Sequence, residues 1–376
     1  ADVLKNLYGK LKYSRIEKMR IVTGGEFERD PYSMAKDIGG EFGAGKIVVR
    51  SSSSNEDGMN TSNAGHYESV LGVDPGNPEE VMRAIREVLE SYKCDLDDVT
   101  DEQVLIQTQV ESISYSGVIF SRELKKNRPY YAITYDEDST DAVTSGRGGK
   151  TVYILRNAHE DSLPEHWHAL IRAMRELEGV FSDYPIDVEF AVDEKNAVTI
   201  FQVRPLAASI RAEKCSISDE EIFAAADRAC QKYREIGDLL GEKNTILSDM
   251  AFWNPAEMIG ENPHPLDYSL YREIITSSAW NQGLSYIGYK EVDGDLMYKL
   301  GNKPYISLRK SFLGLMPDDV DDRLEKKLLE YYNRKLIADP TAHDKIEFEI
   351  AFSEYDFATE DKLRKLETQG FTREEI

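Results

Sequence analysis

Hydrophobic positions along residues 1–206 follow two patterns, which succeed each other along the chain. Short runs rich in β-branched and aromatic residues, typical of strands, alternate with longer stretches whose apolar residues recur every three or four positions, as on one face of a helix. This alternation predicts an α+β fold. The predicted strands are residues 47–50, 104–110, 115–121, 130–135, 152–155, 187–192 and 198–204.

Two helices are signalled clearly in the same part of the chain. One is predicted over residues 78–92, where Asn77 is a suitable cap and Pro78 suits the first turn. The other is predicted over residues 166–181 and ends near Gly179. The first helix has one apolar stripe, which consists of Val81, Ile85, Val88 and Tyr92.

The pattern changes after residue 206. Ser218 and Glu221 form a capping-box signature at the start of a long amphipathic stretch, and a second helix is predicted between Pro317 and Pro340. We therefore expect two domains, residues 1–206 and a mainly helical domain over residues 207–376, with the boundary near residues 206–217.

Composition narrows the possible partners and the compartment. The chain has 376 residues and a formal net charge of −23, which disfavours nucleic acid as a partner. No apolar run of about 18 residues occurs, so we expect no membrane partner. Cys94, Cys215 and Cys230 are scattered and odd in number, which indicates a reducing cytoplasm and neither a disulfide framework nor a zinc site.

One glycine-rich segment has the appearance of a P-loop. It runs from Gly40 to Lys46, but Ile47 follows the lysine where a P-loop has Ser or Thr for magnesium. The next residues are predicted to form a strand, whereas a P-loop opens a helix. The segment is therefore not expected to bind phosphate in this way.

The last strand pair of the first part gathers polar residues on one face. Alternation places Asp187 and Glu189 on one side of their strand, and Gln202 and Arg204 on one side of the next. With a four-residue loop at 193–196, Asp187 would lie opposite Gln202 and Glu189 diagonal to it. The opposite face would then point into a core and carry Val188, Phe190, Val192, Phe201 and Val203.

This polar face has two interpretations. Carboxylate and amide oxygens are ligands that suit Mg²⁺ bound against phosphates, and arginine contacts phosphate in bidentate fashion. The alternative is an ordinary solvent-facing surface with an ion pair. Arg50 adds weight to the first, because it ends a predicted strand just before four serines and would point into a cleft.

Three segments, in order, resemble one enzyme family. VVRSSSSNEDGMNTSNAGHYESVLGV, VLIQTQVESISYSGVIFS and DVEFAVDEKNAVTIFQVRPL are similar to signatures of the phosphoenolpyruvate synthase and pyruvate phosphate dikinase family. The resemblance covers about the first 200 residues. It implies an ATP-grasp nucleotide-binding domain, with ATP and Mg²⁺ between two sheet-bearing lobes.

The resemblance also assigns site residues. It implies that Arg50 and Arg204 act on the ATP phosphates, and that Glu189 and Gln202 bind the metal. Thr108 lies in the strand that matches the one beside adenine, and His66 is interpreted as a structural or loop residue and not as a general base. The full implied nucleotide-binding set is Arg50, Ser51, Gln107, Gln109, Val110, Asp187, Glu189, Gln202 and Arg204.

Two departures from the family pattern matter. The phosphate-binding lysine of the family would lie immediately before residue 1, and Lys10 and Lys12 are poor substitutes by position. The family transfers phosphate through a histidine on a mobile domain, and none of the six histidines has the matching sequence around it. We therefore expect a phosphohistidine domain to be absent from these residues, and expect the partner to be such a domain in the same full-length protein.

The stretch MAFWNPAEMIGENPHPLDYSLY and the opening LKNLYGKLKYSRI resemble a branch of the family with a central acceptor-binding domain, as in rifampicin phosphotransferases and, most closely, L-glutamine kinases. The small-molecule acceptor would then be L-glutamine or a similar compound. The alternatives are a pyruvate-directed synthase or dikinase, and a module that senses ATP without catalysis. An acceptor site could involve Trp253, Asn254, Glu257, Pro265, Ser269 and Tyr271, although Asn254-Pro255 is equally a plain helix start.

Overall fold

The computed structural model describes residues 1–52, 68–94, 96, 98–137, 149–182, 184–206, 217–240, 245–250, 253–346, 349 and 357–376. The chain divides into two compact units, Ala1–Phe223 and Ala224–Ile376. Most of the segment in which we expected a domain boundary, residues 207–216, lies outside the described residues. The bounds 1–206 and 207–376 therefore stay a prediction.

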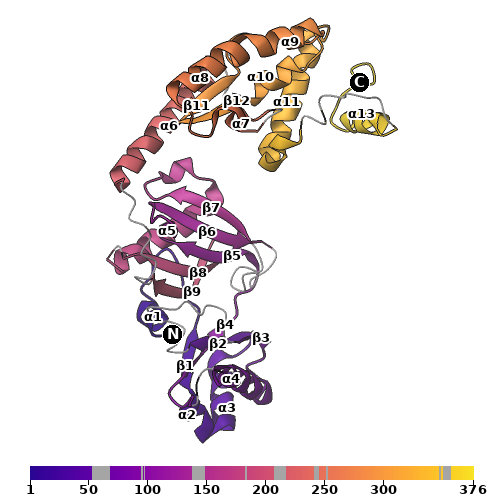
Figure 1. The fold of residues 1–376 in the computed structure, drawn as a ribbon. Helices are drawn as coiled ribbons and strands as arrows, with labels where there is room; N and C mark the ends of the chain where they lie inside the picture. Colours follow the sequence, from indigo (N-terminus) through magenta and orange to yellow (C-terminus); the bar gives the residue numbers. More distant parts are fainter. Residues whose placement is uncertain are drawn as a thin grey trace. The chain divides into compact units, whose positions relative to one another are not determined.

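The first unit contains two antiparallel sheets (Figure 1). We use the term first lobe for the four-stranded sheet with α2–α4, and second lobe for the five-stranded sheet with α1 and α5. The elements of the unit are α1 (Asp2–Leu7), β1 (Met19–Thr23), α2 (Gly24–Arg29), α3 (Pro31–Phe42), β2 (Ile47–Ser52), β3 (Ser69–Val73), α4 (Pro78–Tyr92), β4 (Gln103–Thr108), β5 (Ile113–Phe120), β6 (Tyr130–Asp136), β7 (Lys150–Leu155), a 3₁₀ turn (Glu160–Ser162), α5 (Glu165–Val180), β8 (Ile186–Asp193) and β9 (Val198–Pro205).

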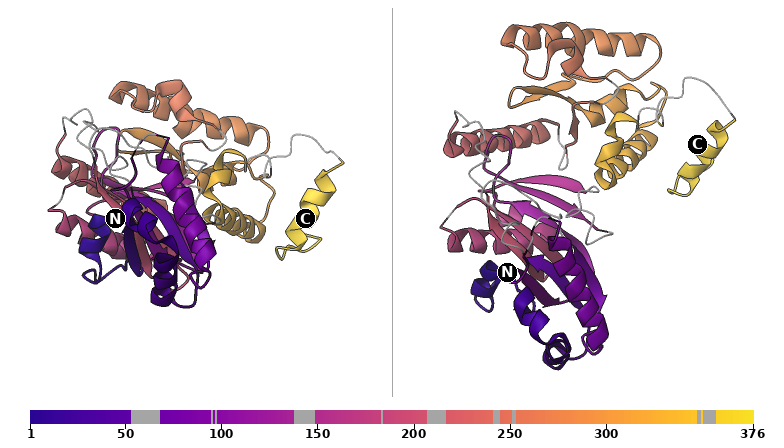
Figure 2. Two further views of the ribbon diagram at one scale, coloured as in Figure 1. Left: turned by 90° about the horizontal axis from the view of Figure 1, so that it is seen from below. Right: turned by 60° about the horizontal axis from the view of Figure 1, so that its bottom comes forward.

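The sheet of the first lobe has the strand order β1-β4-β2-β3 and is covered on one face by α3 and α4 (Figures 1 and 2). The predicted cap of α4 is present, since the Asn77 side chain accepts hydrogen bonds from the backbone of Glu79 and Glu80. The apolar stripe of α4 is buried against Val49 and Ile106 of the sheet. One face of this sheet is therefore taken up by core packing.

The sheet of the second lobe has the order β7-β6-β5-β8-β9, and α5 packs against β8 and β9. Its core contains Trp167 and Leu170 from α5 and Phe190 and Ile200 from the sheet. Gly117 in β5 lies so close to β6 that an added Cβ would be 2.1 Å from the carbonyl oxygen of Thr134. Only glycine fits at that crossing.

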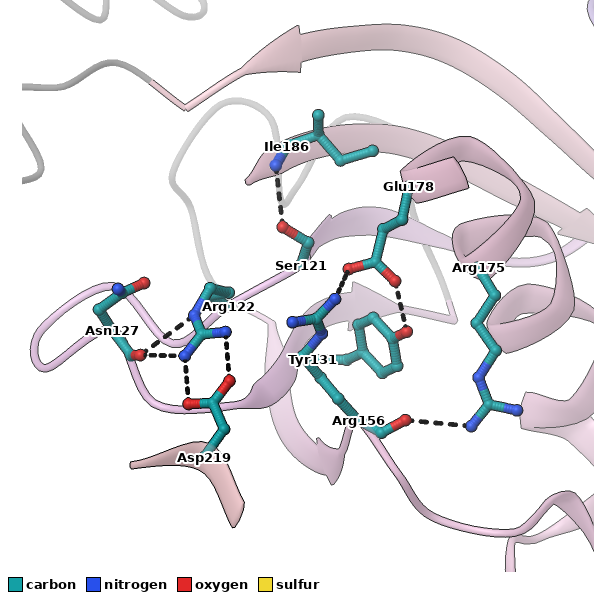
Figure 3. Close-up of polar contacts among 9 residues, drawn as sticks. All are labelled: Ser121, Arg122, Asn127, Tyr131, Arg156, Arg175, Glu178, Ile186 and Asp219. Carbon is teal, nitrogen blue, oxygen red and sulfur yellow. Dashed lines mark hydrogen bonds and ion pairs between the residues drawn. The ribbon is translucent and has the colours of Figure 1, made fainter. Parts of the chain in front are cut away.

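A buried carboxylate ties α5 to the strands of the second lobe (Figure 3). Glu178 accepts a hydrogen bond of 2.6 Å from the Tyr131 hydroxyl and one of 2.7 Å from Arg156. Glu178 is buried, so Tyr131 and Arg156 compensate a charge that would otherwise be costly to bury.

A second ion pair lies nearby. Arg122 binds Asp219 through two hydrogen bonds of 2.7 and 2.8 Å, and holds the pKa of that carboxyl below its usual value.

The second unit is mainly helical, with one small sheet of order β10-β12-β11. Its core includes Leu308, Phe312, Leu329 and Leu336. Its elements are α6 (Asp219–Leu240), which begins in the first unit, β10 (Leu247–Ser248), α7 (Pro255–Ile259), α8 (Pro265–Tyr271), a π-helix (Arg272–Ala279), α9 (Trp280–Tyr286), β11 (Met297–Leu300), β12 (Lys303–Ser307), α10 (Leu308–Gly314), α11 (Asp322–Ala338), a 3₁₀ turn (Pro340–Asp344) and α13 (Thr359–Glu367).

The α+β fold, the two sheet-bearing lobes and the mainly helical second part are confirmed. All seven predicted strands are present. The sequence pattern did not reveal β1 and β3 in the first unit or β10, β11 and β12 in the second. The glycine-rich segment before Ile47 leads from α3 into a strand, so the interpretation that it is not a P-loop is confirmed. No helix in the described residues is both long enough and apolar enough to cross a membrane.

Candidate functional site

Strand β2 presents Arg50 on the face of the first sheet that the helices leave uncovered. Ile47 and Val49 point into the core beneath α4, so Arg50, next along the strand, points the other way. Arg50 pairs in register with Leu105, and Leu105 packs into the core of the second lobe. The face that carries Arg50 is therefore the one turned toward the second lobe.

Arg50 forms an ion pair between the lobes. Its Nη2 lies 2.9 Å from Oε2 of Glu189 in β8, and the two side chains are only 23% and 11% exposed. A charged pair at this depth is screened less by water than a surface pair. The structure thus brings together two residues that are 139 positions apart in the chain.

The register of the β8–β9 hairpin differs from the expected one. Asp187 lies opposite Arg204, and Glu189 lies opposite Gln202, so the prediction that Asp187 faces Gln202 was wrong. The turn after Val192 holds one residue more than expected, and a bulge between Glu189 and Phe190 adds another. Two one-residue shifts together move the pairing by two positions, which leaves all four polar residues on their predicted common face.

Because of the same bulge, Phe201 does not lie where we expected it. Phe190 pairs with Ile200 and Glu189 with Gln202, which leaves Phe201 as the extra residue of β9. Ile200 is buried in the core, whereas Phe201 is half-buried and was wrongly predicted to point there. The guanidinium of Arg50 lies over the Phe201 ring, 5.6 Å from its centroid.

Arg204 is held by the neighbouring carboxylate. Its Nε and Nη2 lie 3.2 and 2.8 Å from the two oxygens of Asp187, and both side chains are largely buried. A bidentate pair fixes the plane of the guanidinium. Two arginines, one from each lobe, are therefore each paired with a carboxylate on the polar face of the β8–β9 hairpin.

Gln107 in β4 lies on the same face of the first sheet as Arg50, since it pairs with Val48. It is 2% exposed, and its Nε2 has no hydrogen-bond partner among the described residues. A buried amide donor without a partner costs about 1–3 kcal/mol, so a ligand that accepts its hydrogen bond would remove that cost. This observation fits the predicted place of Gln107 beside a nucleotide.

The other predicted nucleotide residues are less directly placed. Oε1 of Gln109 accepts a hydrogen bond of 2.7 Å from the backbone of Gly72, which joins the end of β4 to β3. Val110 follows directly and is half-buried. Ser51 lies next to Arg50, on the opposite face of β2, paired with Val104 of the first-lobe core. The structure therefore does not bring Ser51 together with Arg50.

The donor set matches a magnesium ion that is shared with phosphates. Glu189 and Gln202 face each other across the hairpin. Within the described ranges, no group of three or more His, Cys, Asp or Glu residues could hold a metal by itself. Mg²⁺ usually takes one or two protein oxygens together with substrate phosphates, so one carboxylate and one amide oxygen fit this mode of binding.

The remaining candidates fall in three groups. His66 and the serine-rich loop after Ser52 lie outside the described residues. Lys12 places its ammonium 4.9 Å from the ring centroid of its neighbour Tyr13. In the second unit, Asn254 caps α7, as the plain structural interpretation predicts. Trp253 stacks on Trp280 at 4.7 Å between ring centroids.

The sequence did not reveal that Phe201 is a neighbour of Arg50. Phe201 was assigned to the core because strict alternation leaves no other place for it. A bulge has no fixed sequence signature unless it contains a glycine, so nothing in the strand distinguished Phe201 from Ile200.

Comparison with known proteins gives one family and several distant structures. Residues 26–136 match the family described as "Pyruvate phosphate dikinase, AMP/ATP-binding domain". No curated protein matches the chain.

Solved structures align with about half of the chain at low identity. D-alanyl-alanine synthetase A from Vibrio cholerae is 14% identical, with 55% of this chain and 52% of that chain covered and a TM-score of 0.31. The D-alanine-D-alanine ligase from Coxiella burnetii is 11% identical, with coverage of 55% and 47% and a TM-score of 0.29. The dinucleotide-forming acetyl-coenzyme A synthetase 1 from Ca. Korarchaeum cryptofilum is 16% identical, with coverage of 50% and 84% and a TM-score of 0.33.

The chain therefore spans about half the length of the first two of these proteins. The family match covers the first lobe from α2 to β4, with Arg50 and Gln107, continues through β5 and β6, and ends before β8 and β9. Residues 26–136 of this chain are thus similar to the N-terminal ATP-binding domain of the phosphoenolpyruvate synthase and pyruvate phosphate dikinase family.

Proposed function

We propose that this chain is the MgATP-binding part of a dikinase-type phosphotransferase, with an ATP-grasp-type nucleotide site in its first unit. The observation that carries the proposal is the meeting of Arg50 from one lobe with Glu189 from the other, beside the fixed pair of Arg204 and Asp187. The family match over residues 26–136, which include Arg50, supports an ATP-binding role.

In this proposal Arg50 and Arg204 bind the phosphates. Phosphoryl transfer depends on positioning and on neutralising charge, and arginine supplies both through paired N–H donors. Because Asp187 already fixes the guanidinium of Arg204, little reorganisation is needed when a phosphate arrives. Gln107 would donate to the base from its buried amide, and Gln109 and Val110 would complete the nucleotide-binding set, whereas Ser51 lies on the opposite face of β2.

Glu189 and Gln202 would hold Mg²⁺, which supplies charge neutralisation between the phosphates when it is bound. Their backbone positions face each other on adjacent strands, so both side chains can reach one ion. Asp187 is the next carboxylate on the same face, and it would remain the partner of Arg204.

The transfer itself requires a nucleophile from a separate swivelling domain of the same full-length protein. A histidine nitrogen on that domain would attack the β-phosphorus of ATP, forming a pyrophosphohistidine and releasing AMP. Water would then remove the terminal phosphate as inorganic phosphate. The remaining phosphoryl group would pass to a small acceptor, for which L-glutamine is our first candidate, and restore the histidine.

A first prediction concerns nucleotide binding. We expect saturating MgATP to raise the melting temperature of the first unit by ~5 °C, since a ligand at a hundred times its Kd adds about 2.7 kcal/mol of stability. Differential scanning calorimetry checks this, with MgCl₂ alone and ATP with EDTA as controls. An unchanged transition at millimolar MgATP would count against the site.

A second prediction separates the metal from the phosphates. Gln202→Ala is expected to weaken MgATP binding by about tenfold and to leave metal-free ATP binding within about twofold, since it removes one metal oxygen and no phosphate contact. Isothermal titration calorimetry with and without EDTA measures both. Val203→Ala, a core change in the next residue, is the matched control and should alter stability but not the dependence on magnesium.

A further inference from the structure

The bulge in β9 turns an aromatic ring toward the polar face. Side chains normally alternate along a strand, but the extra residue of a bulge breaks this alternation and re-aims a side chain. In β9 the extra residue is Phe201, and its ring lies beside Arg50 and not in the core with Ile200. The half-buried ring of Phe201 therefore lies among the charged groups of the polar face.

Arg50 has two neighbours of different chemistry. The Glu189 carboxylate lies 2.9 Å from Nη2, and the Phe201 ring centroid lies 5.6 Å from the guanidinium carbon. The carboxylate attracts the guanidinium strongly and also neutralises its charge. The ring attracts it through the negative face of its π-system and leaves the positive charge available.

The first neighbour would be weakened by the proposed function. The ion pair with Arg50 uses Oε2 of Glu189, so the other oxygen can bind a metal, but a magnesium ion on this carboxylate would neutralise much of the charge that attracts the guanidinium. With a weaker ion pair the long side chain of Arg50 gains freedom, which opposes an ordered contact with phosphate. A second neighbour that orients Arg50 without neutralising its positive charge would keep the guanidinium in place.

We propose that Phe201 is this neighbour: it is a positioning residue that keeps Arg50 aimed at the nucleotide phosphates after Glu189 is engaged by the metal. The inference rests on the proposed function, since it assumes MgATP at this face. It adds a role for a residue that the metal and phosphate assignments leave unused. The aromatic ring is needed for its face, not for its volume.

The experiment compares Phe201→Leu with Phe201→Tyr by isothermal titration calorimetry. Leucine is apolar but has no π-face, so we expect MgATP binding to weaken by about threefold to thirtyfold. Tyrosine keeps the ring, so MgATP binding should stay within about twofold of wild type. Adenosine lacks phosphates, and its binding should change less than twofold in both variants.

A double-mutant cycle ties the effect to Arg50. In an Arg50→Met background, Phe201→Leu should have no further effect on MgATP affinity, because the group that the ring positions is gone. Phe190→Leu is the matched control: it changes an aromatic residue on the core face of the facing strand. It should lower the melting temperature and leave the ratio of MgATP to adenosine affinity unchanged.

Four outcomes would overturn the inference. Equal weakening of MgATP and adenosine by Phe201→Leu would mean that the ring contacts the base. Additive effects of Phe201→Leu and Arg50→Met would mean that the ring acts independently of Arg50. Wild-type affinity in Phe201→Leu, with wild-type protein binding MgATP normally, would remove the inference and keep the proposed function. A wild-type protein that binds no MgATP would contradict both.

Discussion

Replacing Arg50 with methionine is expected to weaken MgATP binding by about tenfold to a hundredfold. A hydrogen bond to a charged group contributes about 1.5–3 kcal/mol, and methionine keeps an unbranched apolar side chain while losing every donor. Glu189 also loses its partner, which leaves an acidic group facing the phosphates unless magnesium binds it. Isothermal titration calorimetry with MgATP and with adenosine measures the loss, and adenosine affinity should stay within about twofold.

The matched control for this variant is Arg20→Met. Arg20 lies in β1 of the same lobe, and its Nη1 lies 3.2 Å from Glu41 in a more exposed ion pair. A pair of this kind contributes little, so both stability and nucleotide affinity should be close to wild type. If Arg20→Met and Arg50→Met weakened MgATP binding equally, the effect would come from the overall charge and not from a phosphate contact.

The largest loss of stability is expected from Glu178→Leu, at about 3–5 kcal/mol in the free energy of unfolding. Leucine fills a similar volume but leaves Arg156 and the Tyr131 hydroxyl without their partner (Figure 3). Burial, together with the Glu178 carboxylate, raises the pKa of Tyr131 to about 12. Like any tyrosine at neutral pH its hydroxyl is protonated, and because it is buried it needs an acceptor. Urea denaturation of the variant measures the loss.

Two further variants show whether the lost partner is the cause. Glu165→Leu changes an exposed acidic residue in the first turn of the same helix and should cost less than about 1 kcal/mol. Glu178→Leu combined with Arg156→Leu should recover part of the loss, because an apolar pair replaces an unpaired buried charge. A double variant as unstable as the sum of its parts would point to lost packing, not to an uncompensated charge.

Local patterns predicted the elements of the first unit well because those elements depend on nearby residues. The seven strands follow from β-branched and aromatic runs, and α4 follows from its cap and its stripe. The common polar face of Asp187, Glu189, Gln202 and Arg204 follows from strand alternation, which a shift of two residues does not disturb.

What could not be predicted depends on distant contacts. The pair of Arg50 with Glu189 joins strands of two different sheets, and no spacing in the sequence encodes it. The bulge at Phe201 differs from a regular strand by one residue, and local propensity does not distinguish the two. Gln107 was placed beside the nucleotide by resemblance, but the unpartnered state of its buried amide is visible only in the structure.

A helix of the second unit also contains a contact that sequence periodicity does not predict. Residues nine apart in an α-helix lie about 2.5 turns apart and point in opposite directions. Tyr271 and Trp280 are nine apart, yet both stack on Trp253, because the π-helical segment between them has more residues per turn. A search for α-helical periodicity therefore misreads this stretch.

The bulge in β9 also bears on how such a site changes over evolutionary time. Pairing is regular on both sides of Phe201, with Ile200 in the core and Gln202 on the polar face. Loss of the single codon for Phe201 would leave a strand that alternates without interruption, with every metal and phosphate residue still on its own side. Gain or loss of one residue at this point is thus a route by which a lineage can add or remove the aromatic contact to Arg50 while the other residues of the hairpin keep their faces.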